Sequence, residues 1–259
     1  MIPQSYITAW RKHAPWQEDY QVEQDLIIHR SLIALFSDEF IRERLAFRGG
    51  TALHKLFLKP AVRYSEDIDL VQVNAEPFGG IIDKIRHVLS FLGSPRIIQK
   101  QHNNTIIYRL QSEDNIPIRL KVEVNTREHF SVFGIQNLTV KLESDWDQSE
   151  AAVSVFTLDE LLATKLRALY QRKKGRDLFD LWYALNNAEV NTERVVDAFR
   201  YYMKADGNLI NQKLLIENTE KKINDKNFIG DTNGLLRPGV EYDITEAYKQ
   251  VKKEILEKI

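Results

Sequence analysis

The sequence predicts an α+β protein, with a sheet-forming domain over residues 1–150 and a helical domain over residues 151–259. Short apolar or alternating runs, which are typical of strands, occur in the first domain and, beyond it, only at Val153–Phe156. Apolar residues recur at helical spacing in Val22–Phe36 and Ile81–Leu92, and again through most of the second domain. With 259 residues and 43% hydrophobic content, the chain is long enough to bury a core in each domain.

Strands and helices are expected to alternate in the first domain. A strand at Leu45–Phe47 runs into Arg48-Gly49-Gly50-Thr51 and a helical pattern, ALHKLFL. Further strands are expected over Val62–Leu70, Thr105–Leu110 and Ile118–Val124. Because only turn residues separate the last two strands, they are predicted to form an antiparallel pair.

The second domain is predicted to follow a polar, acidic loop over Ser144–Glu150 and a short strand, Val153–Phe156. Thr157-Leu158-Asp159-Glu160 matches a capping box, which indicates that a helix begins there. Further helices are expected after Gly175 and over Glu193–Met203.

Composition restricts the chemistry that the chain can perform. It has no cysteine, which excludes disulfides, thiolate metal sites and cysteine nucleophiles. The net charge of -1 favours no particular partner, so a nucleic-acid role needs a local basic surface. No apolar run reaches about 20 residues, and the start, MIPQSYITAWRKHAPWQ, lacks an apolar core. A cytoplasmic protein without a membrane segment is therefore expected.

The stretch VRYSEDIDL, residues 62–70, places acids where like charges repel. On a strand, side chains alternate between two faces. One face would then carry Arg63, Ser65, Asp67 and Asp69, whereas Ile68 and Leu70 would enter the core. Two carboxylates on one face suit Mg²⁺, which prefers hard oxygen ligands and removes the repulsion. The alternative is that both Asp residues are surface acids at a strand edge.

Two neighbouring segments fit a site at these acids. Gly49-Gly50-Thr51 lies between a strand and a helix, where backbone amides favour phosphate, although a plain turn has the same pattern. Glu123 lies on an alternating strand and would add a third carboxylate if that strand paired beside the Asp strand. The alternative for Glu123 is a solvated strand face.

Two charged residues of the second domain fall on apolar helical faces. Lys165 aligns with Leu158, Leu161, Leu162 and Leu169, and Asp177 aligns with Leu181, Ala184 and Leu185. A buried ammonium is costly unless it has a partner or faces a cleft. The two residues either serve a site or pair with each other; Lys165 can also extend its ammonium to solvent.

Three segments in this order resemble a known pattern: RGGTALHK, then RYSEDIDL and VEV, then a helical K-x-x-A-h-x-x-R-x-x-x-R-D-h-x-D-h segment at Lys165–Leu181. The set is similar to nucleotidyltransferases of the DNA polymerase β type. The finer resemblance is to the AbiEii/AbiGii toxin family of bacterial nucleotidyltransferases. It implies a nucleotidyltransferase-like mixed sheet with helices, and a helical domain that completes the active site.

The resemblance also implies roles for single residues. Gly49, Gly50 and Thr51 would cradle the triphosphate, and Arg63 and Ser65 would line the pocket. Asp67, Asp69 and Glu123 would bind Mg²⁺, with Mn²⁺ as a possible substitute, and Glu123 would help deprotonate the attacking hydroxyl. Lys165 would contact nucleotide phosphates, and Asp177 would complete the catalytic set.

The implied activity is transfer of a nucleoside monophosphate from an NTP to an RNA acceptor such as tRNA, with release of pyrophosphate. Proteins of this kind are toxins of toxin–antitoxin or phage-defence systems, so a cognate antitoxin is expected. Two alternatives remain open from the residues: a metal-dependent nuclease that uses the same acids, and a nucleotide-binding regulator without turnover.

Overall fold

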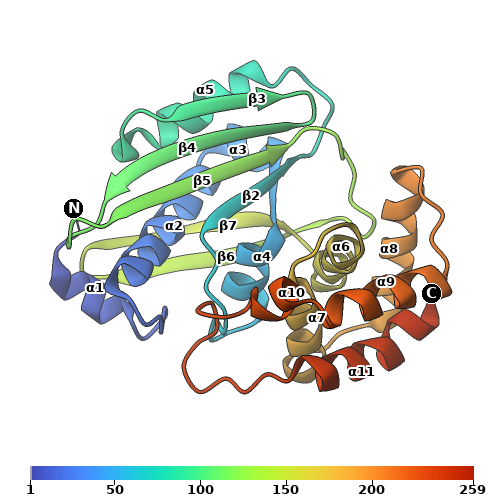
Figure 1. The fold of residues 1–259 in the computed structure, drawn as a ribbon. Coiled ribbons are helices and arrows are strands. Elements are labelled where there is room, and N and C mark those ends of the chain that lie inside the picture. Colours follow the sequence, from blue (N-terminus) through green and yellow to red (C-terminus); the bar gives the residue numbers. More distant parts are fainter. Residues whose placement is uncertain (1) are drawn as a thin grey trace. The chain divides into compact units, whose positions relative to one another are not determined.

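The computed structural model describes residues 2–259 and confirms the predicted α+β class. The chain divides into two compact units, Met1–Phe156 and Thr157–Ile259. The first unit contains the sheet and the second is helical (Figure 1).

The first unit is built on a seven-stranded mixed sheet with the order β3-β4-β5-β2-β1-β7-β6. Its strands are β1 (Leu45–Arg48), β2 (Asp67–Gln72), β3 (Arg96–Lys100), β4 (Asn103–Gln111), β5 (Pro117–Asn125), β6 (Ile135–Ser144) and β7 (Asp147–Phe156). Two neighbouring pairs, β2·β5 and β1·β7, are parallel, and the others are antiparallel. This arrangement puts β2 at the centre, between β5 and β1.

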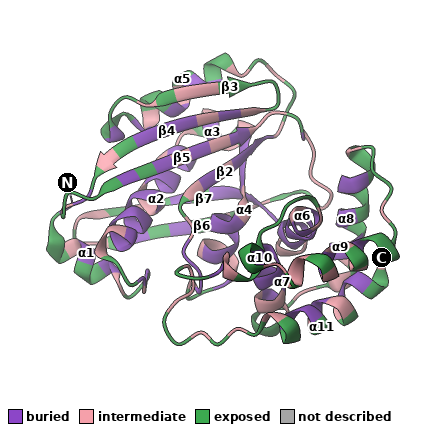
Figure 2. Cartoon of the chain, viewed as in Figure 1, coloured by how far each residue is buried: buried purple, intermediate pink, exposed green. Residues whose placement is uncertain are grey.

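Helices cover one face of the sheet. They are α1 (Gln4–Trp10), α2 (Asp19–Ser37), α3 (Glu39–Arg44), α5 (Gly79–Val88) and the 3-10 turn η2 (Ser90–Leu92). The short α4 (Gly49–Ala52), with its π-helical continuation η1 (Leu53–Phe57), follows β1 and contacts β1 and β2. Helix α2 contacts β2, β5, β6, β7, α3 and α5, so it forms the centre of this layer. Figure 2 shows the resulting alternation of buried and exposed residues along the strands.

Several predicted strands are confirmed. Strands β4 and β5 form the expected antiparallel pair, and β5 lies directly beside β2. The loop predicted over Ser144–Glu150 is wrong, because these residues form the tight end of the β6–β7 hairpin. The polar residues of this hairpin occupy exposed positions at the ends of two long strands. Their acidic composition resembles that of a loop, and the strands were therefore not predicted there.

The strand predicted over Val62–Leu70 begins later than expected, at Asp67. Arg63 and Ser65 therefore precede β2 and do not share a strand face with Asp67 and Asp69, which corrects the predicted arrangement. The physical reason is that β1 and β5, the two neighbours of β2, pair only with residues from Asp67 onward.

The second unit consists of packed helices. They are α6 (Leu158–Gln171), α7 (Gly175–Asn187), α8 (Thr192–Ala205), α9 (Gln212–Ile223), α10 (Lys226–Gly230), α11 (Ile244–Glu254) and the 3-10 turn η3 (Leu256–Lys258). Helix α6 is central and contacts α7, α8 and α9. As predicted, α6 begins with Thr157 as its N-cap, whose hydroxyl accepts from the Glu160 amide.

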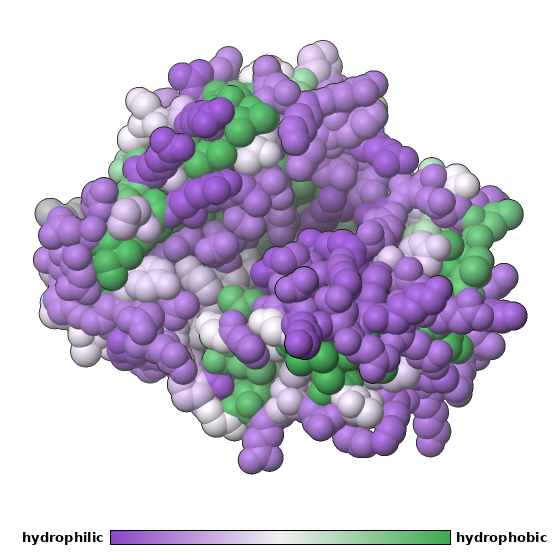
Figure 3. Space-filling model, in the orientation of Figure 1, coloured by the Kyte–Doolittle hydropathy of each residue, from purple (hydrophilic) through white to green (hydrophobic). Residues whose placement is uncertain are grey.

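The surface shown in Figure 3 is largely hydrophilic, with apolar atoms in separate small groups. Among residues 2–259, no helix combines the length and apolarity that a bilayer crossing requires.

Candidate active site

Strands β2 and β5 bring the predicted acids of the first unit to one face of the sheet. In their parallel register Asp69 pairs with Glu123, and Asp67 pairs with Lys121. Paired residues of neighbouring strands point to the same face, so these four side chains form one charged group. Ile68 and Leu70 lie in the core on the other side, as their alternation predicted. We call the four-residue group the acidic face.

Lys121 holds two of the three carboxylates on the acidic face. Its Nζ lies 3.2 Å from Asp67 Oδ2 and 3.3 Å from Glu123 Oε1. Partial burial lowers the pKa of Lys121, but the Asp67 and Glu123 carboxylates outweigh this effect and raise it. The side chains of Asp67 and Glu123 keep 33% and 29% of their surface exposed, so solutes can reach both.

Gly49 packs directly against Asp69. Its φ of +81° lies in the left-handed region, and a Cβ at this position would overlap the Asp69 carboxylate. Arg48, the preceding residue, pairs with Asp69 across β1 and β2. The strand-to-helix turn therefore requires glycine for two independent reasons, and it brings the backbone of the first helical residues up to the acidic face.

Thr51 fastens this turn to the start of β2. Its hydroxyl lies 2.8 Å from the Ser65 hydroxyl and donates to the Asp67 carbonyl. Thr51 is buried, and its hydroxyl is occupied by these two contacts, which fix the start of β2. At this position only the backbone amide can therefore contact a phosphate. Arg63 is also buried, and its Nη1 donates to the Tyr64 carbonyl at 3.0 Å.

A cavity of about 280 Å³ opens on the acidic face. It is lined by Asp69 and Glu123 together with Arg48, His102, Asn103, Asn125, Arg127 and Glu128. Arg48 and Glu128 form an ion pair at 2.6 Å across it. The cavity thus combines carboxylates with cationic side chains, which suits a metal–phosphate ligand.

Asp67 and Asp69 fit a divalent cation by the type of their oxygens and by their position two residues apart on β2. Among residues 2–259, however, no three His, Asp or Glu side chains are grouped as a metal site. Lys121 pairs with both Asp67 and Glu123, so a bound cation would compete with it for either carboxylate, and the assignment of Glu123 as a third metal ligand stays a prediction. Mg²⁺ usually takes one or two carboxylates plus phosphate oxygens, which the two Asp residues satisfy without Glu123.

The two predicted residues of the second unit lie in a buried ion cluster. Lys165 Nζ is 3.3 Å from Asp177 Oδ1 and 2.8 Å from Asp180 Oδ2. Arg172 also binds Asp177, with its Nε 2.7 Å from Oδ2 and its Nη2 2.8 Å from Oδ1. Both carboxylates are fully buried, and the pairing of Lys165 with Asp177, which the sequence left open as an alternative to a role in the site, is present. We call Lys165, Asp177 and Asp180 the buried cluster; Arg172, whose side chain is 50% exposed, binds it from the surface.

Sequence reasoning gave no role to Lys121 or Asp180. The period-2 pattern of β5 already placed Lys121 on the face of Glu123, so the signal was available there. For Asp180 the signal was its position one helical turn after Asp177.

A mixed sheet that presents two Asp residues beside a Gly-Gly-Thr turn defines a nucleotidyltransferase. The family profile described as "Nucleotidyl transferase AbiEii toxin, Type IV TA system" matches residues 30–254. The chain belongs to this family, and is thus a nucleotidyltransferase toxin of a type IV toxin–antitoxin system.

Two solved structures share the fold. MenT4, a nucleotidyltransferase toxin from Mycobacterium tuberculosis H37Rv, has a TM-score of 0.67 at 16% identity, covering 100% of this chain and 91% of its own. A structure described as a nucleotidyltransferase from H. pylori has a TM-score of 0.53 at 16% identity, covering 93% of this chain and 98% of its own. No curated protein matches the sequence.

Proposed function

We propose that this toxin transfers a nucleoside monophosphate from an NTP to the 3′ end of an RNA, in a Mg²⁺-dependent reaction at the acidic face. The observation that carries the proposal is the register of β2 and β5, which puts Asp67, Asp69 and Glu123 on one face beside the Gly49 turn. Binding a nucleotide alone does not need three acids, so this set favours turnover over a purely regulatory role.

The reaction is an attack of the RNA 3′-oxygen on the α-phosphorus of the NTP. A bond forms between these two atoms, and the bond from the α-phosphorus to the oxygen that bridges the α- and β-phosphates breaks. Pyrophosphate leaves with that electron pair. Most of the catalysis in phosphoryl transfer comes from positioning and electrostatics, which fixed side chains and backbone groups can supply.

The chain's own residues divide these tasks. Asp67 and Asp69 would hold Mg²⁺, with Mn²⁺ as a possible substitute; when bound, the cation would neutralise charge on the phosphate oxygens. Glu123 would accept the proton of the attacking hydroxyl, since its carboxylate is partly exposed on the same face. Gly50 and the backbone of α4 would cradle the phosphates of the leaving group.

The side chains of Thr51, Ser65 and Arg63 position the site and would not take part in the reaction itself. Thr51 and Ser65 fix the entry to β2, and Arg63 holds the backbone just before it. The assignment of Lys165 and Asp177 to nucleotide phosphates and catalysis remains a proposal from the family pattern. In the second unit both side chains already have buried ionic partners.

The acceptor proposed here is RNA, and the acceptor end of tRNA in particular. The family implies an NTP substrate and an antitoxin partner, and the structurally similar MenT4 is also a nucleotidyltransferase toxin. The 3′-hydroxyl of an RNA is a suitable nucleophile for a face that offers a nearby carboxylate as base.

The test uses labelled NTPs, Mg²⁺ and total tRNA, with the wild-type protein and Asp69→Asn. The wild type should lengthen the tRNA only when NTP is present. Asp69→Asn should reduce labelling by at least about 100-fold, a loss typical of one essential electrostatic group. Equal labelling by both proteins would refute the proposed site, and RNA shortening without NTP would identify a nuclease instead.

A further inference from the structure

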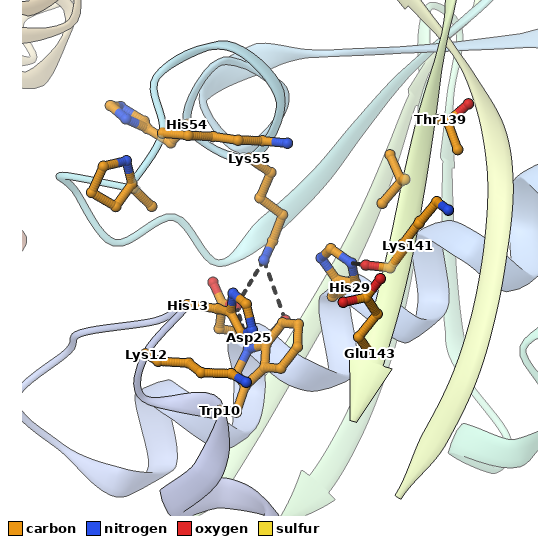
Figure 4. Close-up of a pocket in the computed structure, with 14 residues that line it drawn as sticks. Trp10, Lys12, His13, Asp25, His29, His54, Lys55, Thr139, Lys141 and Glu143 are labelled. Atoms are coloured by element: carbon orange, nitrogen blue, oxygen red, sulfur yellow. Dashed lines mark hydrogen bonds and ion pairs between the residues drawn. The ribbon is translucent and has the colours of Figure 1, made fainter. Parts of the chain in front are cut away.

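A second cavity in the first unit lies apart from the acidic face. Its volume is about 580 Å³, and it is enclosed by the end of α1, by α2, by η1 with the residues that follow it, and by β6 (Figure 4). None of its lining residues lines the cavity on the acidic face. Its size falls in the range of small-molecule sites. We call it the basic cavity, after Lys12, Lys55, Lys59 and Lys141.

A buried ion pair forms the inner wall of the basic cavity. Lys55 Nζ lies 2.7 Å from Asp25 Oδ1, and the same oxygen accepts from Trp10 Nε1 at 2.9 Å. The side chains of Lys55 and Asp25 are only 9% and 6% exposed. Figure 4 shows Lys55 extending from η1 toward Asp25. Lys55 donates to the carbonyl and to the carboxylate of Asp25, so one of its three ammonium protons remains for a ligand.

The cavity has a surplus of positive charge. Four lysines line it, against the carboxylates of Asp25 and Glu143 only, and Lys55 already neutralises Asp25. Lys141 pairs with Glu150 at 3.1 Å, but both side chains are more than half exposed, so water weakens the pair. Within residues 2–259, Lys12 and Lys59 have no ion-pair partner. The lining thus carries lysines from several elements, and two of them, Lys12 and Lys59, are not neutralised by a carboxylate of the described chain.

A neutral histidine, His29, also lies on this wall. Burial, followed by the nearby Lys55, lowers the pKa of His29 to about 4, so this imidazole is neutral at pH 7. Its Nε2 lies 2.9 Å from the Lys141 carbonyl, which requires the proton on that nitrogen. His13 lies against Trp10, with ring centroids 4.5 Å apart, and burial lowers its pKa as well. The cavity therefore keeps a net positive charge set by its lysines.

The backbone that presents Lys55 has an unusual local geometry. In η1 the Leu58 amide donates to the Leu53 carbonyl, five residues back, at 3.0 Å. Such wide turns are rare and are frequently found at functional sites. Since η1 continues directly from α4, the cavity wall and the Gly49 turn belong to one continuous segment.

We propose that the basic cavity binds a small phosphate-bearing molecule. Several ammonium groups on separate elements suit a phosphate, which offers three outer oxygens, better than a ligand with a single carboxylate. Their positive charge excludes a bare cation as the ligand. The two sources of this chemistry are a free inorganic phosphate or pyrophosphate and the 5′-phosphate of a nucleotide. The proposal does not depend on the reaction at the acidic face, because none of the cavity residues has a role there.

The test measures binding by calorimetry with three probes, orthophosphate, pyrophosphate and AMP, in the presence of EDTA. Without a divalent cation the acidic face repels phosphate, so heat reports the basic cavity. The double variant Lys12→Ala/Lys59→Ala should weaken the tightest probe at least tenfold. Lys100→Ala, which removes an exposed lysine of β3 outside the cavity, should change it less than twofold, and so should Asp69→Asn.

The three probes identify the source of the phosphate. Pyrophosphate as the tightest probe assigns the cavity to inorganic phosphates, and AMP as the tightest probe assigns it to nucleotides. Thermal melting checks that all variants fold, which is expected because Lys12 and Lys59 are exposed. No measurable binding of any probe by the wild type, or equal weakening by Lys100→Ala and the double variant, would overturn the proposal.

Discussion

The acidic face of the first unit and the buried cluster of the second contain the same elementary arrangement, one lysine that bridges two carboxylates. Lys121 lies 3.2 Å and 3.3 Å from Asp67 and Glu123, and Lys165 lies 3.3 Å and 2.8 Å from Asp177 and Asp180. The difference is burial, because the first two carboxylates are about one-third exposed and the last two are fully buried.

This difference determines what each lysine can do. An exposed ion pair contributes little to stability and exchanges readily with water, ions or substrate. A buried pair that loses one partner leaves an uncompensated charge in a medium of low dielectric. The comparison therefore indicates that a cation or a substrate can displace Lys121 from the carboxylates of the acidic face. The ion pairs of the buried cluster instead hold α6 and α7 together.

The largest expected effect concerns stability. Asp180→Asn should reduce the free energy of unfolding by about 3 kcal/mol or more, because Lys165 then keeps only the Asp177 carboxylate, which Arg172 shares. Glu123→Gln, the matched change on the acidic face, should alter it by less than about 1 kcal/mol. Urea unfolding of both variants measures the difference, and similar losses would contradict the distinction by burial.

The next effect concerns the Gly49 turn. Gly49→Ala should reduce nucleotidyl transfer at least about 100-fold, because the new methyl group displaces the Asp69 carboxylate. Gly93→Ala is the control, since Gly93 has a similar φ of +84° and open space around a Cβ. If Gly93→Ala reduces transfer as strongly, backbone strain and not the contact with Asp69 explains the loss.

The strands that could be predicted from the sequence are those with at least one face buried in the core. The alternation in β4 and β5 and the apolar run of β1 gave their positions, because those strands lie inside the sheet. Edge strands β3 (Arg96–Lys100) and β6 (Ile135–Ser144) and the first part of β7 were missed. The residues of β3 are exposed or half-buried, so periodicity against a core gave little signal. In β6 the signal was present, because Leu138, Val140 and Leu142 alternate with polar residues.

The residues of the candidate site could be predicted from the sequence, but most of the contacts between them could not. The spacing of Asp67 and Asp69 and the position of Glu123 predicted a shared face, which the register of β2 and β5 confirms. Pattern alone could not show that Lys121 holds two of the acids, since this depends on pairing between residues 54 positions apart in the sequence, such as Asp67 and Lys121. Nor could it reveal the contact between Gly49 and Asp69, which depends on the turn geometry.

The third effect in size is the pH dependence of stability that His29 gives to the first unit. The pKa of His29 is lowered from 6.5 to about 4 in the folded protein, so the unfolded chain binds more protons between these values. Stability is therefore fully present above pH 6.5 and falls as the pH drops toward 4, by about 1 to 2 kcal/mol at pH 5. His29→Gln should reduce this pH dependence in urea unfolding; an unchanged slope would assign it to other groups.

The smallest expected effect sharpens the role of Lys121. Lys121→Met removes a cation that competes for Asp67 and Glu123, so Mn²⁺ should bind a few-fold more tightly, a change of up to about 1 kcal/mol. Titration followed by electron paramagnetic resonance measures this affinity without turnover. Weaker Mn²⁺ binding would mean that Lys121 instead holds the carboxylates in their binding geometry.

The most direct test of the site is the position of a divalent cation beside a bound nucleotide. Crystals grown with Mn²⁺ and a non-hydrolysable NTP analogue should show an anomalous peak about 2.1 Å from carboxylate oxygens of Asp67 and Asp69, with the triphosphate against Gly49–Thr51. A Mn²⁺ peak at Asp177 and Asp180, or a triphosphate bound without contact to the acidic face, would contradict the proposed centre of nucleotidyl transfer.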